Sequence, residues 1–305
     1  MFNHSEIGQR SLEDVIGIMG HQIRALGHEI VWDTKNDQFL NTVGGQGWNI
    51  VVEGFTPHSI GIMKQGYEAG ARFIILATEE PTPKGFNHGT QFEMIKRQET
   101  FPDAAHWAEG IICLVPGDHV VNWYGQFCPA AYTELGFAPS LLRVTNKVPT
   151  YDFGFYGSVT KRRLRILKKL ARHARLSENA VRIIGDFKSQ MERDEIMRES
   201  KVIVQIRKFD EMGLVSSSRC NTALCLGRPV VAEPHLLSKP WDEIVRFTTT
   251  TEGFYDTCLI ARATWKGLHR SQFETFKEKL SPEKCVGAAF EKIGIMNKDF
   301  SQRAA

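Results

Sequence analysis

The stretch Tyr151-Asp152-Phe153-Gly154-Phe155-Tyr156-Gly157-Ser158, with the basic run 161–170 that follows it, decides the fold of the chain. An apolar strand runs into a glycine turn and then into a helix, which is the unit from which parallel sheets are built. The first N–H groups of such a helix have no partner within the helix, and the helix dipole adds positive charge there. We therefore expect Gly157 and Ser158 to bind an anion such as phosphate. Arg162 and Arg163 lie at the start of the helix and can add charge-assisted hydrogen bonds.

A second segment predicts the other half of the same site. It reads Ser217-Ser218-Arg219-Cys220-Asn221-Thr222-Ala223-Leu224-Cys225-Leu226-Gly227 and continues as Arg228-Pro229-Val230-Val231-Ala232-Glu233. The pattern indicates a short helix that ends at Gly227 and is followed by a buried strand. We expect this helix to line the same ligand pocket as the turn at Gly157. The alternative is that Gly157 only makes a tight connection between strand and helix.

Length and composition indicate a globular protein of two domains. The 305 residues suit two domains of about 150 residues each. Hydrophobic residues make up 42% of the chain and charged residues 24%, so a packed core is expected and disorder is not. The 38 Lys and Arg residues nearly balance the 35 Asp and Glu residues, so nucleic acid is not an expected partner.

Cysteine usage and hydropathy indicate the compartment. The six cysteines contain no CxxC pair, and several lie in apolar runs, as Cys113 does, where a free thiol packs as a core residue. No apolar run approaches the roughly 20 residues that span a bilayer. We expect a cytoplasmic protein.

Apolar strands alternate with helices along both halves of the chain. The expected strands are 28–32, 48–52, 72–77, 110–115, 153–156, 181–184, 202–206 and 230–232. The expected helices are 11–27, 59–69, 90–98, 129–135, 161–174, 190–200, 217–226 and 238–245. Strands that are apolar throughout indicate parallel sheets covered on both faces. The predicted fold class is therefore α/β, with Rossmann-like doubly wound domains at 1–147 and 148–305 that face a central cleft.

The motifs of the second half resemble the donor domain of GT-B glycosyltransferases, in particular the family 4-like and CgeB-like enzymes. The resemblance is carried by Phe155-Tyr156-Gly157-Ser158 with Arg162 and Arg163, by Ile183-Ile184-Gly185, and by the run from Arg219 to Glu233. In the first half, the segment from Gly20 to Gly27-His28-Glu29 looks like the first helix and second strand of these enzymes. The resemblance implies that a nucleotide-diphosphate sugar binds to Gly157, Ser158, Arg162, Arg163, Gly185 and Arg219. It also implies transfer that retains the anomeric configuration.

One position departs from the pattern of that family. The glutamate that binds the donor ribose falls on Thr222, and the preceding phenylalanine falls on Asn221. A threonine hydroxyl can bond to a sugar, but it cannot accept from two ribose hydroxyls as a carboxylate does. Glu233, just after the strand, is the candidate to supply a carboxylate in its place.

The first half is expected to present the acceptor. His88 lies in a loop rich in proline and glycine directly after a strand, and His119 follows another strand in Pro116-Gly117-Asp118-His119. Together with Arg219, these histidines are the candidate catalytic residues. No HxH or HExxH cluster occurs, so we expect no metal and no cofactor, with the arginines neutralising the diphosphate instead.

The predicted function is transfer of a hexose-like sugar from a nucleotide sugar to a hydroxyl of a glycan, a lipid-linked acceptor or a protein. An epimerase or hydrolase acting on nucleotide sugars is an alternative, because such enzymes share the two-domain layout. A catalytically degenerate nucleotide-sugar binding protein is another, because of Thr222. The basic helix at 161–176 is expected to be a solvated outer face. A minority interpretation is that it makes a peripheral contact with the anionic inner face of a membrane.

Overall fold

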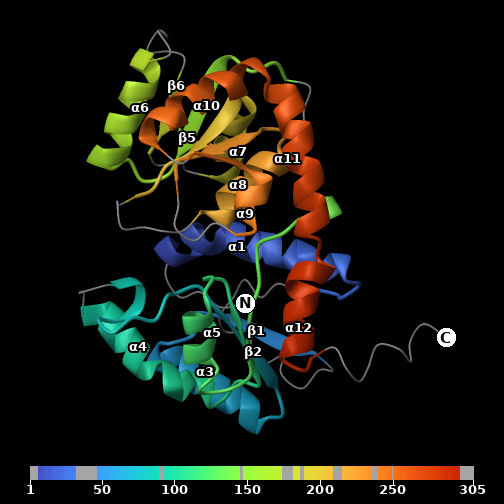
Figure 1. The fold of residues 1–305 in the computed structure, drawn as a ribbon. Helices are drawn as coiled ribbons and strands as arrows, with labels where there is room; N and C mark the ends of the chain where they lie inside the picture. The colour runs from blue at the N-terminus through green and yellow to red at the C-terminus, as the bar shows by residue number, and fades with distance from the viewer. Residues whose placement is uncertain are drawn as a thin grey trace, which may run out of the picture. The chain divides into compact units, whose positions relative to one another are not determined.

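The computed structural model describes residues 6–31, 47–88, 92–144, 147–173, 181–185, 189–208, 215–234, 239–248 and 250–295. The chain forms two compact units, Met1–Leu135 with Pro282–Ala305, and Gly136–Ser281. Each unit contains one parallel β-sheet with helices packed around it (Figure 1).

The first unit is built on a four-stranded sheet. Its strands are β1 (Trp48–Val52), β2 (Arg72–Ala77), β3 (Gly110–Cys113) and β4 (Ala130–Tyr132), in the order β1-β2-β3-β4 and all parallel. Strand residues such as Val51, Ile75 and Ile111 are fully buried, as expected for a sheet covered on both faces. The helices are α1 (Glu6–Ala25), α3 (Pro57–Glu68), α4 (Phe92–Ala105), α5 (Asp118–Tyr124) and, near the end of the chain, η4 (Glu283–Gly287) and α12 (Ala288–Lys292).

Two elements predicted in the first half are wrong. The expected helix at 129–135 is strand β4, and the connecting helix is α5, which the sequence analysis did not include. The expected strand at 28–32 is absent over residues 28–31, and Trp32 lies outside the described residues. Gly27 ends α1 with φ +88°, and the ring of His28 packs edge-on against Phe290 with centroids 5.9 Å apart. The apolar residues after Gly27 thus follow a helix end without entering a strand.

The second unit has a five-stranded parallel sheet in the order β6-β5-β7-β8-β9. Its strands are β5 (Tyr151–Tyr156), β6 (Val181–Ile184), β7 (Ser200–Gln205), β8 (Val230–Ala232) and β9 (Arg246–Phe247). Since β5 pairs with β6 on one side and β7 on the other, the strand order reverses at β5. Ligands of doubly wound folds bind outside the carboxyl ends of the strands at such a reversal. The α/β class and the parallel Rossmann-like sheets agree with the prediction.

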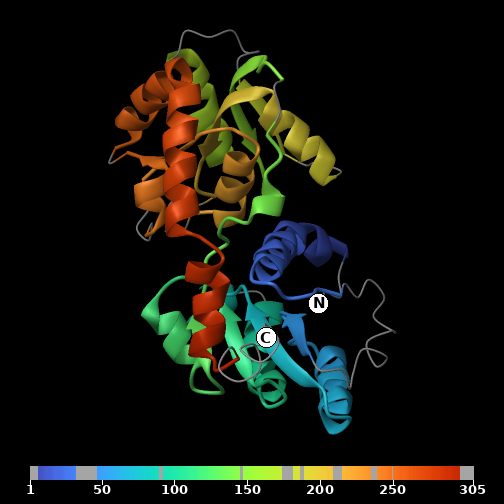
Figure 2. The ribbon, with the colours of Figure 1, turned by 90° about the vertical axis from the view of Figure 1, so that its right-hand side faces the viewer.

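Helices cover this sheet on its two faces. They are α6 (Lys161–His173), α7 (Gln190–Arg198), α8 (Ser217–Cys225), α9 (Trp241–Ile244), α10 (Thr251–Ala263) and α11 (Trp265–Lys279). The core joins Phe153 and Phe155 of β5 to Leu167 of α6 and to Phe254 and Cys258 of α10. The long orange-red helix beside the sheet in Figure 2 is α11.

The domain bounds 1–147 and 148–305 remain a prediction, and the compact units divide the chain after Leu135 and after Ser281. The segment after residue 135, including η2 (Pro139–Leu141), bonds to α8: Asn221 donates to the carbonyl of Gly136 at 2.6 Å, and the N–H of Arg143 donates to the carbonyl of Cys225 at 2.9 Å. Near the end of the described chain, Ile293 packs closely against Gly110 of β3. A Cβ on Gly110 would lie 2.9 Å from Cδ1 of Ile293. The last described residues therefore belong to the core of the first unit.

Candidate functional site

The turn after β5 is shaped for close approach of an arginine. Gly157 has φ +119°, a conformation that L side chains rarely adopt. A Cβ at this position would lie 2.8 Å from Nη2 of Arg219. The positive φ therefore favours glycine at this position, and a Cβ would displace the end of the Arg219 side chain, at the carboxyl end of the strand where the sheet order reverses.

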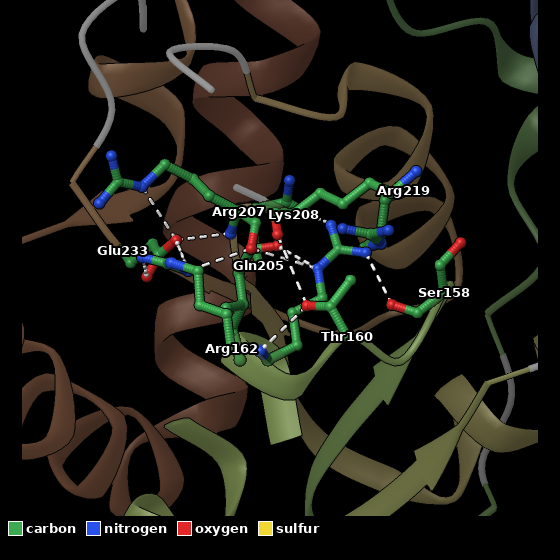
Figure 3. A network of polar contacts seen from close by, with 10 residues as sticks. Ser158, Thr160, Arg162, Gln205, Arg207, Lys208, Arg219 and Glu233 are labelled. Atoms are coloured by element: carbon green, nitrogen blue, oxygen red, sulfur yellow. Dashed lines mark hydrogen bonds and ion pairs between the residues drawn. The ribbon is translucent and has the colours of Figure 1, made fainter. Parts of the chain in front are cut away.

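Four arginines gather at this end of the sheet (Figure 3). Arg162 and Arg163 come from the first turn of α6, Arg207 follows β7, and Arg219 lies in α8. Thr160 caps α6, because its hydroxyl accepts from the N–H of Arg163 at 3.2 Å. Residues far apart in sequence are thus brought together by the carboxyl ends of β5 and β7 and the starts of two helices.

Glu233, just after β8, holds two of these arginines. Its Oε1 accepts from Arg162 Nη1 at 2.9 Å and from Arg207 Nε at 3.0 Å, and its Oε2 accepts from Arg162 Nη2 at 3.1 Å. The backbone N–H of Arg207 also donates to Oε1, at 2.5 Å. Because the carboxylate is buried and both oxygens are bonded, Glu233 orients arginines in this structure. A contact of Glu233 with the donor ribose remains a prediction.

Arg163 and Arg219 are held by neutral acceptors. Arg163 donates to the carbonyl of Ile206 at 3.0 Å and to that of Ser158 at 3.0 Å, and Arg219 donates to the side-chain oxygen of Gln205. Neither has a carboxylate within ion-pair distance among the described residues. Both are almost fully buried, at 5% and 7% exposure, and Nε of Arg219 is buried with no hydrogen-bond partner in the described part of the chain.

The electrostatics of the cluster favour a bound anion. Burial, together with the neighbouring charges of Arg219 and Arg162, lowers the pKa of Arg163 to about 10, against the opposing effect of Glu233. Arg219 also lies over the ring of Tyr156, with its guanidinium carbon 4.9 Å from the ring centroid. Arg163 and Arg219 are buried cations, and the nearby carboxylate of Glu233 already binds Arg162 and Arg207. The cluster therefore keeps positive charge that a phosphate would neutralise.

Gly185 and Thr222, two further candidate site residues, have different surroundings. A Cβ on Gly185, after β6, would come 3.0 Å from Cγ2 of Val159, so the glycine allows the 157–160 turn to pack closely. Thr222 is inside α8 and only 4% exposed, so a ligand reaches it only if neighbouring residues move. Asn221 is used in packing, through its bond to Gly136.

The two candidate histidines belong to the first unit. His119 is in the first turn of α5, 57% exposed, with Nε2 3.2 Å from Oε1 of Glu80. The backbone of His88 ends the short helix η1 (Phe86–His88), and its side chain lies outside the described residues. The acceptor-side assignments of both histidines remain predictions.

A buried polar cluster that sequence reasoning missed lies at the carboxyl ends of β1 and β2. Arg97 of α4 donates from Nη2 to Glu53 at 2.7 Å and from Nη1 to Glu79 at 2.8 Å, and Asn87 also donates to Glu79. Burial and the charge of Glu79 raise the pKa of Glu53 to about 7, against the opposing effect of Arg97. Glu53 comes directly after one predicted strand, and one residue separates Glu79 from the end of another. This position after a strand was the signal by which the sequence could have indicated the cluster.

The described ranges contain no group of three or more His, Cys, Asp or Glu side chains that could hold a metal ion.

Sequence comparisons give no relative. No model of a known protein family matches the chain, and no curated protein matches it significantly.

Solved structures are similar in fold. An alpha,alpha-trehalose-phosphate synthase (UDP-forming) from Burkholderia xenovorans, in complex with glucose-6-phosphate, aligns at a TM-score of 0.54 and 10% identity, over 92% of this chain and 79% of the other. The N-terminal domain of a Candida albicans trehalose-6-phosphate phosphatase aligns at 0.53 and 9% identity, over 97% and 82%. A trehalose-6-phosphate protein from E. coli bound with UDP-2-fluoro glucose aligns at 0.50 and 8% identity, over 96% and 80%.

This chain shares the α/β fold with Rossmann-like parallel-sheet units of GT-B glycosyltransferases. At 8 to 10% identity the likeness concerns the fold alone. The closer resemblance to CgeB-like donor domains remains a prediction from the motifs.

Proposed function

We propose that this protein is a glycosyltransferase that moves a sugar from a nucleotide-diphosphate sugar to an acceptor hydroxyl. The observation that carries the proposal is the pair Arg163 and Arg219, two buried cations without a carboxylate partner in the described chain, beside Gly157 at the strand reversal. Among common ligands of a doubly wound fold, a diphosphate suits this charge and this place.

The cluster would act on the leaving group. When the bond between sugar and diphosphate breaks, negative charge grows on the terminal phosphate, and pre-oriented donors in a buried site stabilise it. Arg219 and Arg163 would supply these donors, with the N–H groups of the Gly157-Ser158 turn. Glu233 and Gln205 would be positioning residues, because they hold Arg162, Arg207 and Arg219 in place. In this proposal the arginines neutralise the diphosphate without a metal ion, and the configuration at the anomeric carbon is retained.

The structural neighbours support the choice of substrate class. One is named as UDP-forming and was solved with glucose-6-phosphate, and another was solved with UDP-2-fluoro glucose. By analogy, a nucleoside diphosphate would occupy the second unit of this chain, with Thr222 near the ribose. The acceptor would be a hydroxyl of a sugar phosphate, a glycan, a lipid-linked sugar or a protein, and His88 and His119 are the candidates to contact it.

Calorimetric titration with UDP, GDP, ADP and dTDP tests the donor site. Arg219→Ala should weaken binding of the preferred nucleotide by about 1.5 to 3 kcal/mol, the range for a hydrogen bond to a charged group. Arg165→Ala is the matched control: it removes an exposed arginine from α6 without touching the cluster. Arg219→Lys, which keeps the charge but loses the planar fork, separates loss of geometry from loss of charge.

Activity is tested by release of nucleoside diphosphate from the preferred donor with and without acceptor. Acceptor-dependent release that Arg219→Ala abolishes is expected. If no nucleotide binds, or if Arg219→Ala and Arg165→Ala bind it equally well while both remain folded by circular dichroism, the donor-site assignment is wrong. Binding without any acceptor-dependent release would refute the transferase and favour a binding protein.

A further inference from the structure

The outer face of α6 carries a continuous basic stripe. Lys161, Arg165, Lys168 and Arg172 are exposed and follow one another at spacings of four, three and four residues, so they share one side of the helix. At 1.5 Å per residue they extend over roughly 16 Å. The helix itself contains no acidic residue. This set of four residues is called the basic stripe below.

Other basic residues of α6 have counter-charges, and Arg162 binds Glu233 in the arginine cluster. On the side of α10, Lys169 lies 3.8 Å from Glu252, and His173 lies 2.9 Å from Asp256. Across the described ranges, no carboxylate lies within ion-pair distance of the four residues of the basic stripe. The positive charge of the basic stripe therefore stays without a carboxylate partner in the described ranges, on a helix that lies at the outside of its unit in Figure 1.

Apolar groups accompany the stripe. Leu164 lies between its basic residues, and together they line a shallow hollow of about 430 Å³ that also includes Lys169. Val159, just before the helix, is 42% exposed. The opposite side of α6 is fixed in the core by Ile166, Leu167 and Leu170, so the helix can present the stripe without refolding.

We propose that the basic stripe docks this protein onto an anionic phospholipid bilayer. Lysines and arginines near an anionic surface are attracted to it, and a few apolar side chains can enter the headgroup region. A single-stranded nucleic acid would favour aromatic side chains for base stacking, and the stripe and hollow contain none. Every helix in the described part of the chain is too short or too polar to cross a membrane, so the contact is one at the surface. The inference is independent of the proposed transferase activity.

Co-sedimentation of the full chain with vesicles tests the docking surface. Vesicles of pure phosphatidylcholine are compared with vesicles of phosphatidylcholine and phosphatidylglycerol at 7:3, at low and high salt. Each basic residue near the surface contributes about 1 kcal/mol, or roughly fivefold in partition coefficient. Substituting R165Q, K168Q and R172Q together should therefore lower binding to anionic vesicles about a hundredfold. High salt should weaken wild-type binding as well.

The control changes the net charge equally at other exposed sites. K84Q, K266Q and R270Q together remove three positive charges outside α6 and should change vesicle binding by less than fivefold. Nucleotide affinity should be the same in both triple variants, because none of these residues lies in the arginine cluster. Three results overturn the proposal: equal binding of wild type to neutral and anionic vesicles, equal losses in the two triple variants, or binding to a single-stranded RNA through the stripe without binding to vesicles.

Discussion

Replacing Glu53 by glutamine should remove a loss of stability that wild-type protein shows as pH rises. Glu79 is buried and Glu53 is 16% exposed, and the two share Arg97, with contacts of 2.8 and 2.7 Å. Two carboxylates against one guanidinium leave an excess negative charge in a poorly solvated place. Burial and Glu79 therefore raise the pKa of Glu53 from its ordinary value of 4.5 to about 7, although Arg97 acts in the other direction.

The direction of the pH effect follows from proton uptake. Between pH 4.5 and 7 the folded state holds a proton on Glu53 that the unfolded state has lost, so the free energy of unfolding falls as pH rises through this window. Below pH 4.5 both states are protonated, and above about pH 7 the loss is complete. The difference between the pKa values of Glu53 in the folded and unfolded states corresponds to roughly 3 kcal/mol in the free energy of unfolding, since each pKa unit is worth about 1.4 kcal/mol.

Urea unfolding at pH 5 and pH 8, followed by tryptophan fluorescence, measures this difference. The free energy of unfolding of Glu53→Gln, relative to wild type, should rise by up to roughly 3 kcal/mol from pH 5 to pH 8. Glu93→Gln, which removes an exposed carboxylate from α4, controls for the change in net charge. A constant difference between Glu53→Gln and wild type over this range, or a difference that falls, would refute the reasoning.

Three further substitutions test the geometry of the second unit. Gly157→Ala should lower the free energy of unfolding by about 1 to 3 kcal/mol because of the positive φ, and it should weaken nucleotide binding by displacing Arg219. The control is Gly61→Ala, at a helical glycine with open space around it, which should be neutral or stabilising in the same thermal melts. Asn221→Ala should cost about 1 to 3 kcal/mol in urea unfolding, because the carbonyl of Gly136 loses a buried donor, with no direct effect on nucleotide affinity. Thr222→Val should change nucleotide affinity by no more than about 1.5 kcal/mol in calorimetry, since only a neutral hydrogen bond is at stake; a larger loss in a folded variant would mean that Thr222 has a greater role at the ribose.

Much of the second unit could be predicted from sequence because its local signals agree. The apolar run up to Tyr156, the positive-φ glycine after it and the amphipathic helix from Lys161 all lie within a few residues of one another. The same holds for the helix and strand on either side of Gly227. Local signals were weaker in the first unit, where β4 has three residues and α5 seven, too few for a periodic pattern to separate helix from strand.

Contacts between residues that are far apart in the sequence could not be predicted from the sequence. Nothing local connects Glu53 to Arg97, which are 44 residues apart, because their meeting depends on β1 and α4 being neighbours in the folded unit. The place of residues 136–143 likewise depends on long-range bonds to α8, and that of residues 282–295 on packing with the first sheet.

Glu233 and Arg219 show most directly what the sequence determined and what the tertiary structure decided. The sequence by itself determined that an arginine lies near the start of a helix and a carboxylate just after a buried strand, since both follow from periodicity and from the glycine at 227. Only the tertiary structure decided that Glu233 binds Arg162 and Arg207 while Arg219 is buried against the neutral side chain of Gln205. The reason is the order of the strands: β7 lies between β5 and β8, so their carboxyl ends bring these side chains into one cluster, and strand order is set by packing of the whole sheet.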